Sequence, residues 1–205
     1  MENTGTSEAL SDHAMQTTRA TPYCRTLSRD VLGEGIGLHS GVRSKVRLRP
    51  ADPGTGIRFV RTTPDFETAI EAIPAHERNV IDTRLCTVLG QGDARVSTVE
   101  HLLAAINGCG VTDLEILVDA EELPIFDGSA APWVHMLRDG GLIRDGRVRK
   151  ALHLAYPVRV EDGDRFIEIL PSPRFSIEAT IDFPDPAIGR QGTGTLEGEE
   201  TIMRL

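Results

Sequence analysis

The sequence is poor in aromatic residues, in cysteine and in basic charge. Aromatic residues make up 4% of the 205 positions, and there are three cysteines. Lys and Arg number 22 against 31 Asp and Glu, which gives a formal net charge of −9. This deficit of positive charge argues against binding nucleic acid through a general basic surface. No apolar run approaches the roughly 18 residues that a membrane-spanning helix needs.

The cysteines and the N-terminus exclude further classes of protein. Cys24, Cys86 and Cys109 are odd in number and form no C-x-x-C pair, which excludes a disulfide framework and a Cys-based zinc knuckle and predicts a reducing, cytoplasmic location. Residues 1–23 are polar and lack the apolar stretch of a secretory signal. We expect them to form a flexible leader outside the fold.

What remains has the composition of an ordinary globular protein, with 40% hydrophobic and 26% charged residues. Alternation of polar and apolar residues predicts strands over 25–31, 44–49, 57–61, 83–89, 112–119, 150–160, 165–170 and 174–183. Helices are predicted from Ser97 to about Gly108 and near 132–139, where Pro132 suits a first turn. Because strands and helices do not alternate regularly, the pattern favours an α+β fold of sandwich layers over a doubly wound sheet.

The segment boundaries predict a first domain over 24–148 and a partial second domain over 149–205. The basic run 144–150 is interpreted as a solvated linker or the start of a strand. The last twelve residues, 194–205, resemble the start of a helix and contain no stop signal. We therefore expect the second domain to be incomplete at the C-terminus.

The glycine-rich segment G-E-G-I-G at 33–37 does not fit a dinucleotide-binding fingerprint. That fingerprint needs G-x-G-x-x-G at the start of a helix, whereas Gly37 is followed by Leu-His-Ser-Gly and another predicted strand. The segment is too rich in glycine for a regular strand. It is interpreted as a tight connection that requires positive φ angles.

Glu100 and His101 are the first chemical candidates. His101 offers an imidazole to a metal, and Glu100 can serve as a general base. The alternative is structural, because Ser97 to Glu100 has the spacing of a capping box and His101 can simply lie on the helix surface. Adjacent helical residues are about 100° apart, so both face one site only at a frayed first turn.

Other candidates have simpler structural explanations. His135 and Asp139 are one helical turn apart, but the helix carries a packing face and the spacing is expected by chance. Residues 127–132 fit an Asp-Gly turn with a serine that caps the next helix. Cys86 fits a core thiol, and Phe175 fits core packing as well as stacking on a base.

Four segments together carry a family resemblance: GxGLHSG at 35–41, TRLCT at 83–87, STVEHLLAAINGCG at 97–110 and EELPIFDGSAAP at 121–132. In order and spacing they resemble the UDP-3-O-acyl-N-acetylglucosamine deacetylases of lipid A biosynthesis in Gram-negative bacteria. VRVEDGD and FSIEATIDFPDPAI, beginning at Val158 and Phe175, resemble the opening of that family's second domain. The resemblance covers about residues 24–190.

The resemblance implies a two-domain, layered β-sheet/helix sandwich with the active site between the domains. It implies a Zn²⁺ enzyme that hydrolyses the N-acetyl group of a UDP-linked acylated glucosamine. By the same resemblance, His101 is a zinc ligand and Glu100 the general base. Leu85, Cys86 and Thr87 form a strand near the zinc and the acyl chain, and Phe175 lies near the uridine.

One departure from the family pattern leaves two hypotheses. The family's other zinc ligands come from an H-K-x-x-D segment, and its general acid is a further downstream histidine; neither occurs in these 205 residues. The first hypothesis is a deacetylase whose sequence is cut short. The second is a catalytically dead remnant or a fragment that only binds. Because a catalytic zinc normally has three protein ligands, we expect weak zinc binding by this chain alone.

Overall fold

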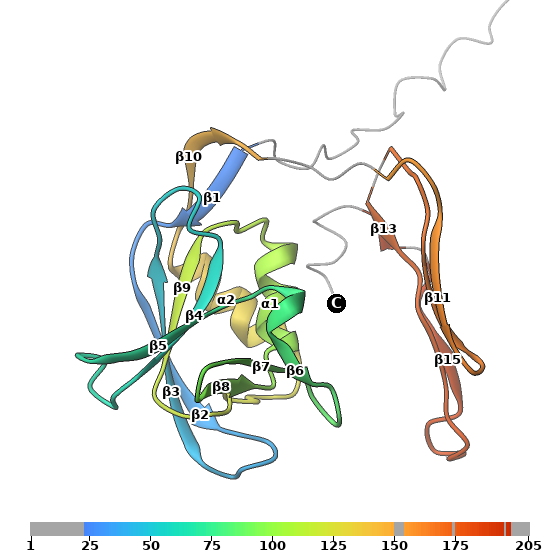
Figure 1. The fold of residues 1–205 in the computed structure, drawn as a ribbon, viewed down its shortest axis with the longest axis horizontal. Helices are drawn as coiled ribbons and strands as arrows, with labels where there is room; N and C mark the ends of the chain where they lie inside the picture. The colour runs from blue at the N-terminus through green and yellow to red at the C-terminus, as the bar shows by residue number, and fades with distance from the viewer. Residues whose placement is uncertain (1–22, 150–153, 174, 195, 198–205) are drawn as a thin grey trace, which may run out of the picture.

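A five-stranded sheet lies at the centre of the computed structural model, which describes residues 23–149, 154–173, 175–194 and 196–197 (Figure 1). Its strands follow the spatial order β2-β3-β9-β4-β5. They comprise β2 Val31–Ile36, β3 Arg43–Pro50, β4 Ile57–Thr62, β5 Ala69–Pro74 and β9 Leu114–Val118. β4 and β9 are parallel, and every other neighbouring pair is antiparallel. All five residues of β9 are buried, as expected for a central strand covered on both faces.

Two helices pack against this sheet and form the core with it. α1 spans Glu100–Gly108 and α2 spans Ala131–Asp139. Phe59 and Ile116 from the sheet, together with Leu102 and Trp133 from the helices, are fully buried in one apolar cluster. Burying a side chain of this size contributes about 1.5–3 kcal/mol. Neither helix is long and apolar enough to cross a membrane, and the same holds throughout the part of the chain that the structure describes.

Two smaller sheets complete the region before residue 150. β6 Val80–Asp82, β7 Val88–Gln91 and β8 Ala94–Ser97 form a three-stranded antiparallel sheet, preceded by the short 3₁₀ helix η1 Glu77–Asn79. β1 Tyr23–Leu27 pairs antiparallel with β10 Leu142–Val148. After α2 the chain therefore pairs with β1, the first strand that the structure describes.

The residues after 153 form strand pairs that lie apart from the central sheet (Figure 1). The pairs are β11 Val158–Asp162 with β12 Arg165–Ile169, β13 Ser176–Ile177 with β16 Leu196–Glu197, and β14 Thr180–Asp182 with β15 Arg190–Gly192. Between 154 and 194, every residue that the structure describes is exposed except the half-buried Gly189. The buried core thus belongs to the region before residue 150.

The α+β class predicted from the sequence is confirmed, and both helices and the strands near 44–49, 57–61 and 112–119 are present. Three predictions were wrong in part. Residues 33–36 of the glycine-rich segment belong to strand β2, where Gly33 and Gly35 have no positive φ, and the tight turn follows them over residues 37–41, with a positive φ at Gly41. Residues 84–86 form bends between the irregular residues 83 and 87, and the strand begins only at Val88. Residues 142–148 form strand β10 and not a solvated linker.

The C-terminal predictions are tested only in part. The hairpin turn at 161–164 is present between β11 and β12. Leu196–Glu197 forms strand β16 where the sequence indicated the start of a helix. The predicted leader 1–23 is one residue too long, because Tyr23 begins strand β1. Residues 1–22 and 198–205 lie outside the described residues, so the predictions made for them remain predictions.

Candidate active site

A buried glutamate joins three of the family-like segments. Glu122 is 4% exposed, and its carboxylate accepts hydrogen bonds from His39 N at 2.9 Å, Ser40 N at 2.7 Å and Thr98 Oγ1 at 3.0 Å. Burial acts to raise the pKa of Glu122, but the hydrogen bonds from Ser40, His39 and Thr98 outweigh burial and hold the pKa below its usual range. Glu122 is therefore ionised at neutral pH.

Gly37 lies against this carboxylate and has no room for a side chain. A Cβ built at Gly37 would stand 2.5 Å from Glu122 Oε2 and 2.6 Å from Ser40 Oγ. Glycine is thus required at this position by close approach, not by a left-handed backbone. The turn at the end of the G-x-G-L-H-S-G segment, residues 37–41, therefore packs against Glu122.

The start of α1 differs from the capping box predicted from the sequence. The helix begins at Glu100, and the N-cap residue Val99 makes no side-chain capping hydrogen bond. The hydroxyl of Ser97 donates to Glu121 O, and that of Thr98 donates to Glu122. The capping role proposed for Ser97 and Glu100 was wrong, because both side chains have partners outside the helix.

Glu100 reaches the loop that carries the L-C-T sequence. Its half-buried carboxylate accepts a hydrogen bond from Thr87 N, with N–O distances of 3.2 and 3.3 Å. Cys86 is half-buried beside Thr87, whereas Leu85 is 90% exposed and has a φ of +68°. The structure brings Thr87 to Glu100 and leaves Leu85 open to a ligand.

His101 is half-buried and stands near the Asp127 loop. Hydrogen bonds from Ser129 N and Oγ lower the pKa of Asp127, and the charge of His101 adds to this effect. The same Ser129 hydroxyl accepts from Ala131 N at the start of α2. The predicted Asp-Gly turn is therefore present, but the N-cap residue of α2 is Ala130, which makes no side-chain cap, and Ser129 lies one residue before it. Segments 37–41, 83–87 and 121–129 therefore converge on the N-terminal end of α1.

The fit to zinc is partial. A catalytic zinc site normally uses three protein ligands. Among the described residues the site offers one imidazole, that of His101, with the carboxylates of Glu100 and Asp127 nearby. These residues form one side of a metal site and do not complete it.

Phe175 and His135 lie elsewhere. Phe175 is 55% exposed and directly precedes β13, which stands well apart from α1 (Figure 1). The structure therefore does not bring Phe175 to Glu100, and its role near the uridine stays a prediction. His135 and Asp139 are exposed on α2.

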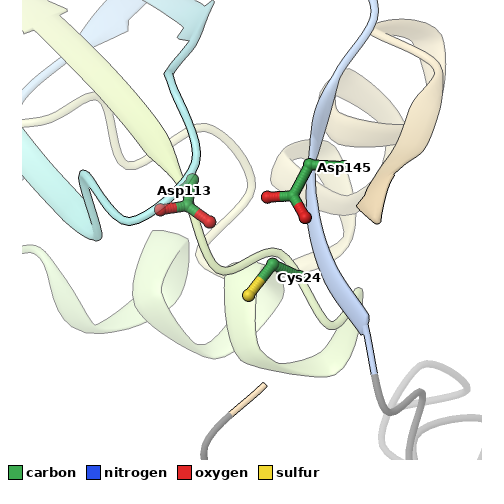
Figure 2. A group of neighbouring side chains, drawn as sticks. All are labelled: Cys24, Asp113 and Asp145. Atoms are coloured by element: carbon green, nitrogen blue, oxygen red, sulfur yellow. The ribbon is translucent and has the colours of Figure 1, made fainter. Parts of the chain in front are cut away.

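A second group of metal-type side chains lies at the other end of α1. The ligand atoms of Cys24, Asp113 and Asp145 are within 4.8 Å of one another, and the two carboxylates point toward each other (Figure 2). Asp113 already accepts hydrogen bonds from Gly54 N, Gly56 N and the neighbouring threonine hydroxyl. These bonds give Asp113 a structural role in holding the turn before β4.

Sequence reasoning missed Glu122 and Thr98. Both are buried polar residues, and Thr98 has a φ of +57° that no local pattern indicates. The sequence offered one signal for Glu122, the pair of glutamates in EELP, but nothing in it shows that the second glutamate is buried. Polar and apolar alternation would instead place Glu122 at the surface, because the next residue, Leu123, is buried.

The comparisons with known proteins agree with the convergence of these segments. Residues 24–202 match the family described as LpxC, UDP-3-O-acyl N-acetylglycosamine deacetylase. Three relatives carry the name UDP-3-O-acyl-N-acetylglucosamine deacetylase. Those of Geobacter sp. (strain M21), Haemophilus influenzae (strain 86-028NP) and Sodalis glossinidius (strain morsitans) are 44%, 46% and 46% identical to the chain over 169, 168 and 165 residues.

These alignments cover 82%, 81% and 80% of this chain but 54%, 54% and 53% of the respective relatives. The chain thus spans about half the length of the curated relatives it matches. The family match covers most of the chain and all four segments around Glu100 and His101. The chain therefore belongs to the UDP-3-O-acyl-N-acetylglucosamine deacetylase family.

Proposed function

We propose that this chain provides the Glu100 and His101 side of a site that hydrolyses the N-acetyl group of UDP-3-O-acyl-N-acetylglucosamine. The products are the free amine and acetate, in lipid A biosynthesis. The observation that carries the proposal is the convergence of segments 37–41, 83–87 and 121–129 on the start of α1. We place the reaction in the cytoplasm, in keeping with three cysteines that form no disulfide bond.

Glu100 serves as the general base in this proposal. Its carboxylate accepts a proton from the water that attacks the acetyl carbonyl carbon. The C–N bond of the amide then breaks as the nitrogen takes up a proton in exchange for the one that Glu100 received, which leaves the free amine and acetate. The Thr87 N–H holds the carboxylate in place. His101 would hold Zn²⁺ together with ligands that the described residues do not supply. When bound, the metal lowers the pKa of water and polarises the carbonyl.

Substrate contacts follow from the same arrangement. Leu85 and Cys86 lie in the loop that reaches Glu100, so we assign them, with Thr87, to the acyl-chain side of the substrate. The exposure of Leu85 supports this role, because an exposed apolar side chain next to a catalytic group suits an apolar ligand. Phe175 is proposed for the uridine, on the resemblance alone.

A second candidate function is binding without turnover by this chain alone. It is supported by the single imidazole among the described residues at the site. We expect the isolated 205-residue protein to bind Zn²⁺ weakly and to deacetylate substrate only marginally. Stoichiometric zinc that survives dialysis, with turnover near that of a complete family member, would contradict this expectation.

A chimaera tests the main proposal. This chain is joined to the half of the Haemophilus influenzae relative that it does not match, and release of the free amine from UDP-3-O-acyl-N-acetylglucosamine is followed by mass spectrometry. We expect turnover by the chimaera and at most a trace by the chain alone. A folded, zinc-loaded chimaera without turnover would refute the proposed function.

A further inference from the structure

The strongest unassigned feature is the buried carboxylate of Glu122. Three chain segments meet around it, and none of its hydrogen-bond partners belongs to its own segment. Oε1 accepts from His39 N and Thr98 Oγ1, and Oε2 accepts from Ser40 N. Hydrogen bonds to a buried charged group are each worth more than neutral ones, so this carboxylate fixes its partners firmly.

The partner that matters most for the site is Thr98. Its φ of +57° lies in the left-handed region, where a β-branched residue is rare. Such a conformation persists only where the surroundings hold it, and the hydroxyl bond to Glu122 Oε1 does so. On either side, Ser97 N donates to Glu121 O, and Leu123 N donates to Ser97 O.

The chain enters α1 immediately after Thr98. Val99 is fully buried in the core but makes no side-chain cap, so the described start of the helix lacks a capping side chain of its own. The torsion at Thr98 determines where the first turn points. That turn carries Glu100 and His101.

We propose that Glu122 is a positioning residue of the deacetylase site. Its carboxylate, acting through the Thr98 hydroxyl, sets where α1 begins and so where Glu100 and His101 stand. The consequence for catalysis rests on the proposed function, whereas the placement of the helix start can be measured in this chain by itself. Glutamine cannot replace Glu122, because its amide nitrogen would face the N–H of Ser40 or of His39 in place of an acceptor oxygen.

Amide hydrogen exchange of the 205-residue protein, read by NMR, tests the placement. Glu122→Gln should lower protection of the amides of residues 103–106, which donate to the carbonyls of residues 99–102 in the first turn, by about 10–100-fold, while α2 and β9 keep theirs. Glu121→Gln is the matched control, since Glu121 is the neighbouring residue, is exposed, and has an ion pair with Arg95 at 3.4 Å. An equal loss over α1, α2 and β9, or no loss at all, would overturn the proposal.

A pair of variants at Thr98 decides the question even if Glu122→Gln does not fold. Thr98→Val keeps the shape and removes only the hydroxyl, and Thr98→Ser keeps the hydroxyl. Thr98→Val should reproduce the selective loss at 103–106, and Thr98→Ser should retain protection. Equal behaviour of the two variants would show that the hydroxyl bond to Glu122 does not place the helix.

Turnover of the chimaera provides the catalytic arm. Glu122→Gln and Thr98→Val should each lower kcat by about 10–100-fold with KM unchanged, since displacement of a catalytic group costs rate rather than binding. The double variant should lose no more than the single ones. Additive losses would overturn the proposal. A parent chimaera without turnover would refute the proposed function, while the exchange measurements would still decide the role of Glu122.

Discussion

At the scale of single residues, a structural and a catalytic role of Glu100 can be distinguished by experiment. The structure removes the capping role, because the carboxylate accepts from Thr87 N and not from the helix start. Glu100→Gln keeps an acceptor oxygen for Thr87 but cannot take up a proton. In the chimaera we expect kcat to fall about 10²–10⁴-fold, with thermal stability and zinc content unchanged. Full turnover with lowered stability would show that Glu100 is only structural; Glu67→Gln, at an exposed position, is the control.

Glu115 on β9 provides a prediction about pH. Its side chain is 9% exposed on the face of the sheet away from the helices, between Arg49 and Arg58. Burial acts to raise the pKa of Glu115, but the hydrogen bonds from Arg58 and Arg49 outweigh burial and lower the pKa below its usual value. The two ion pairs of Glu115 therefore contribute fully to the free energy of unfolding above about pH 4.3, and this contribution is lost as the pH falls through the folded-state pKa of Glu115.

Glu115→Gln should accordingly destabilise the fold by about 1–3 kcal/mol at pH 7. The difference from the parent should shrink as the pH falls below about 4, measured by urea unfolding at a series of pH values. Glu71→Gln, at an exposed position on β5 of the same sheet, should show no such dependence. A difference that stays constant down to pH 3 would refute the assignment.

At the scale of elements, two glycines form a matched pair: Gly141 lies in the turn between α2 and β10, and Gly146 lies within β10. Gly141 and Gly146 both have positive φ, +71° and +82°. A Cβ at Gly141 would lie 2.5 Å from Ser28 Oγ, whereas none of the described atoms lies within 4 Å of one at Gly146. Both alanine variants carry the left-handed strain of about 1–2 kcal/mol, and only Gly141→Ala adds the clash. The melting temperature of Gly141→Ala should be the lower of the two by several degrees, and equal values would contradict the contact.

The elements also show how far the sequence alone could predict the fold. β9 and α1 were predicted because each packs against the core along its length, so the spacing of its apolar residues follows the period of a strand or a helix. β2 was missed because its glycines are set by contacts with residues far away in the sequence, such as Pro124 at Gly35 and Met136 at Gly33. β10 was missed because its partner β1 lies more than a hundred residues earlier.

The candidate site divides in the same way. Glu100 and His101 were found because four segments resemble one family. The bond between Thr98 and Glu122 was not found, because it joins residues 24 apart and depends on a backbone torsion that no local pattern encodes. Tertiary packing, not local preference, determined this part of the site.

At the scale of the whole molecule, burial is concentrated before residue 150. We propose that the first domain spans 24–148 and that a partial second domain spans 149–205. Because residues 154–194 are almost all exposed, limited proteolysis of the purified chain should leave a core of roughly residues 24–148. Mass spectrometry of the fragments checks this. If residues 154–194 resist the protease as well as the core does, the two-domain division is wrong.

The position of β9 imposes an order of assembly on the chain as it is synthesised. The hairpins β2–β3 and β4–β5 are complete by residue 74, yet in the finished sheet they do not touch along a strand edge, because β9 lies between them. Neither half can be joined to the other until residues 114–118 have left the ribosome. Until then each hairpin presents an open edge to its surroundings, so the nascent chain stays open to edge-to-edge pairing with other chains until β9 has been synthesised.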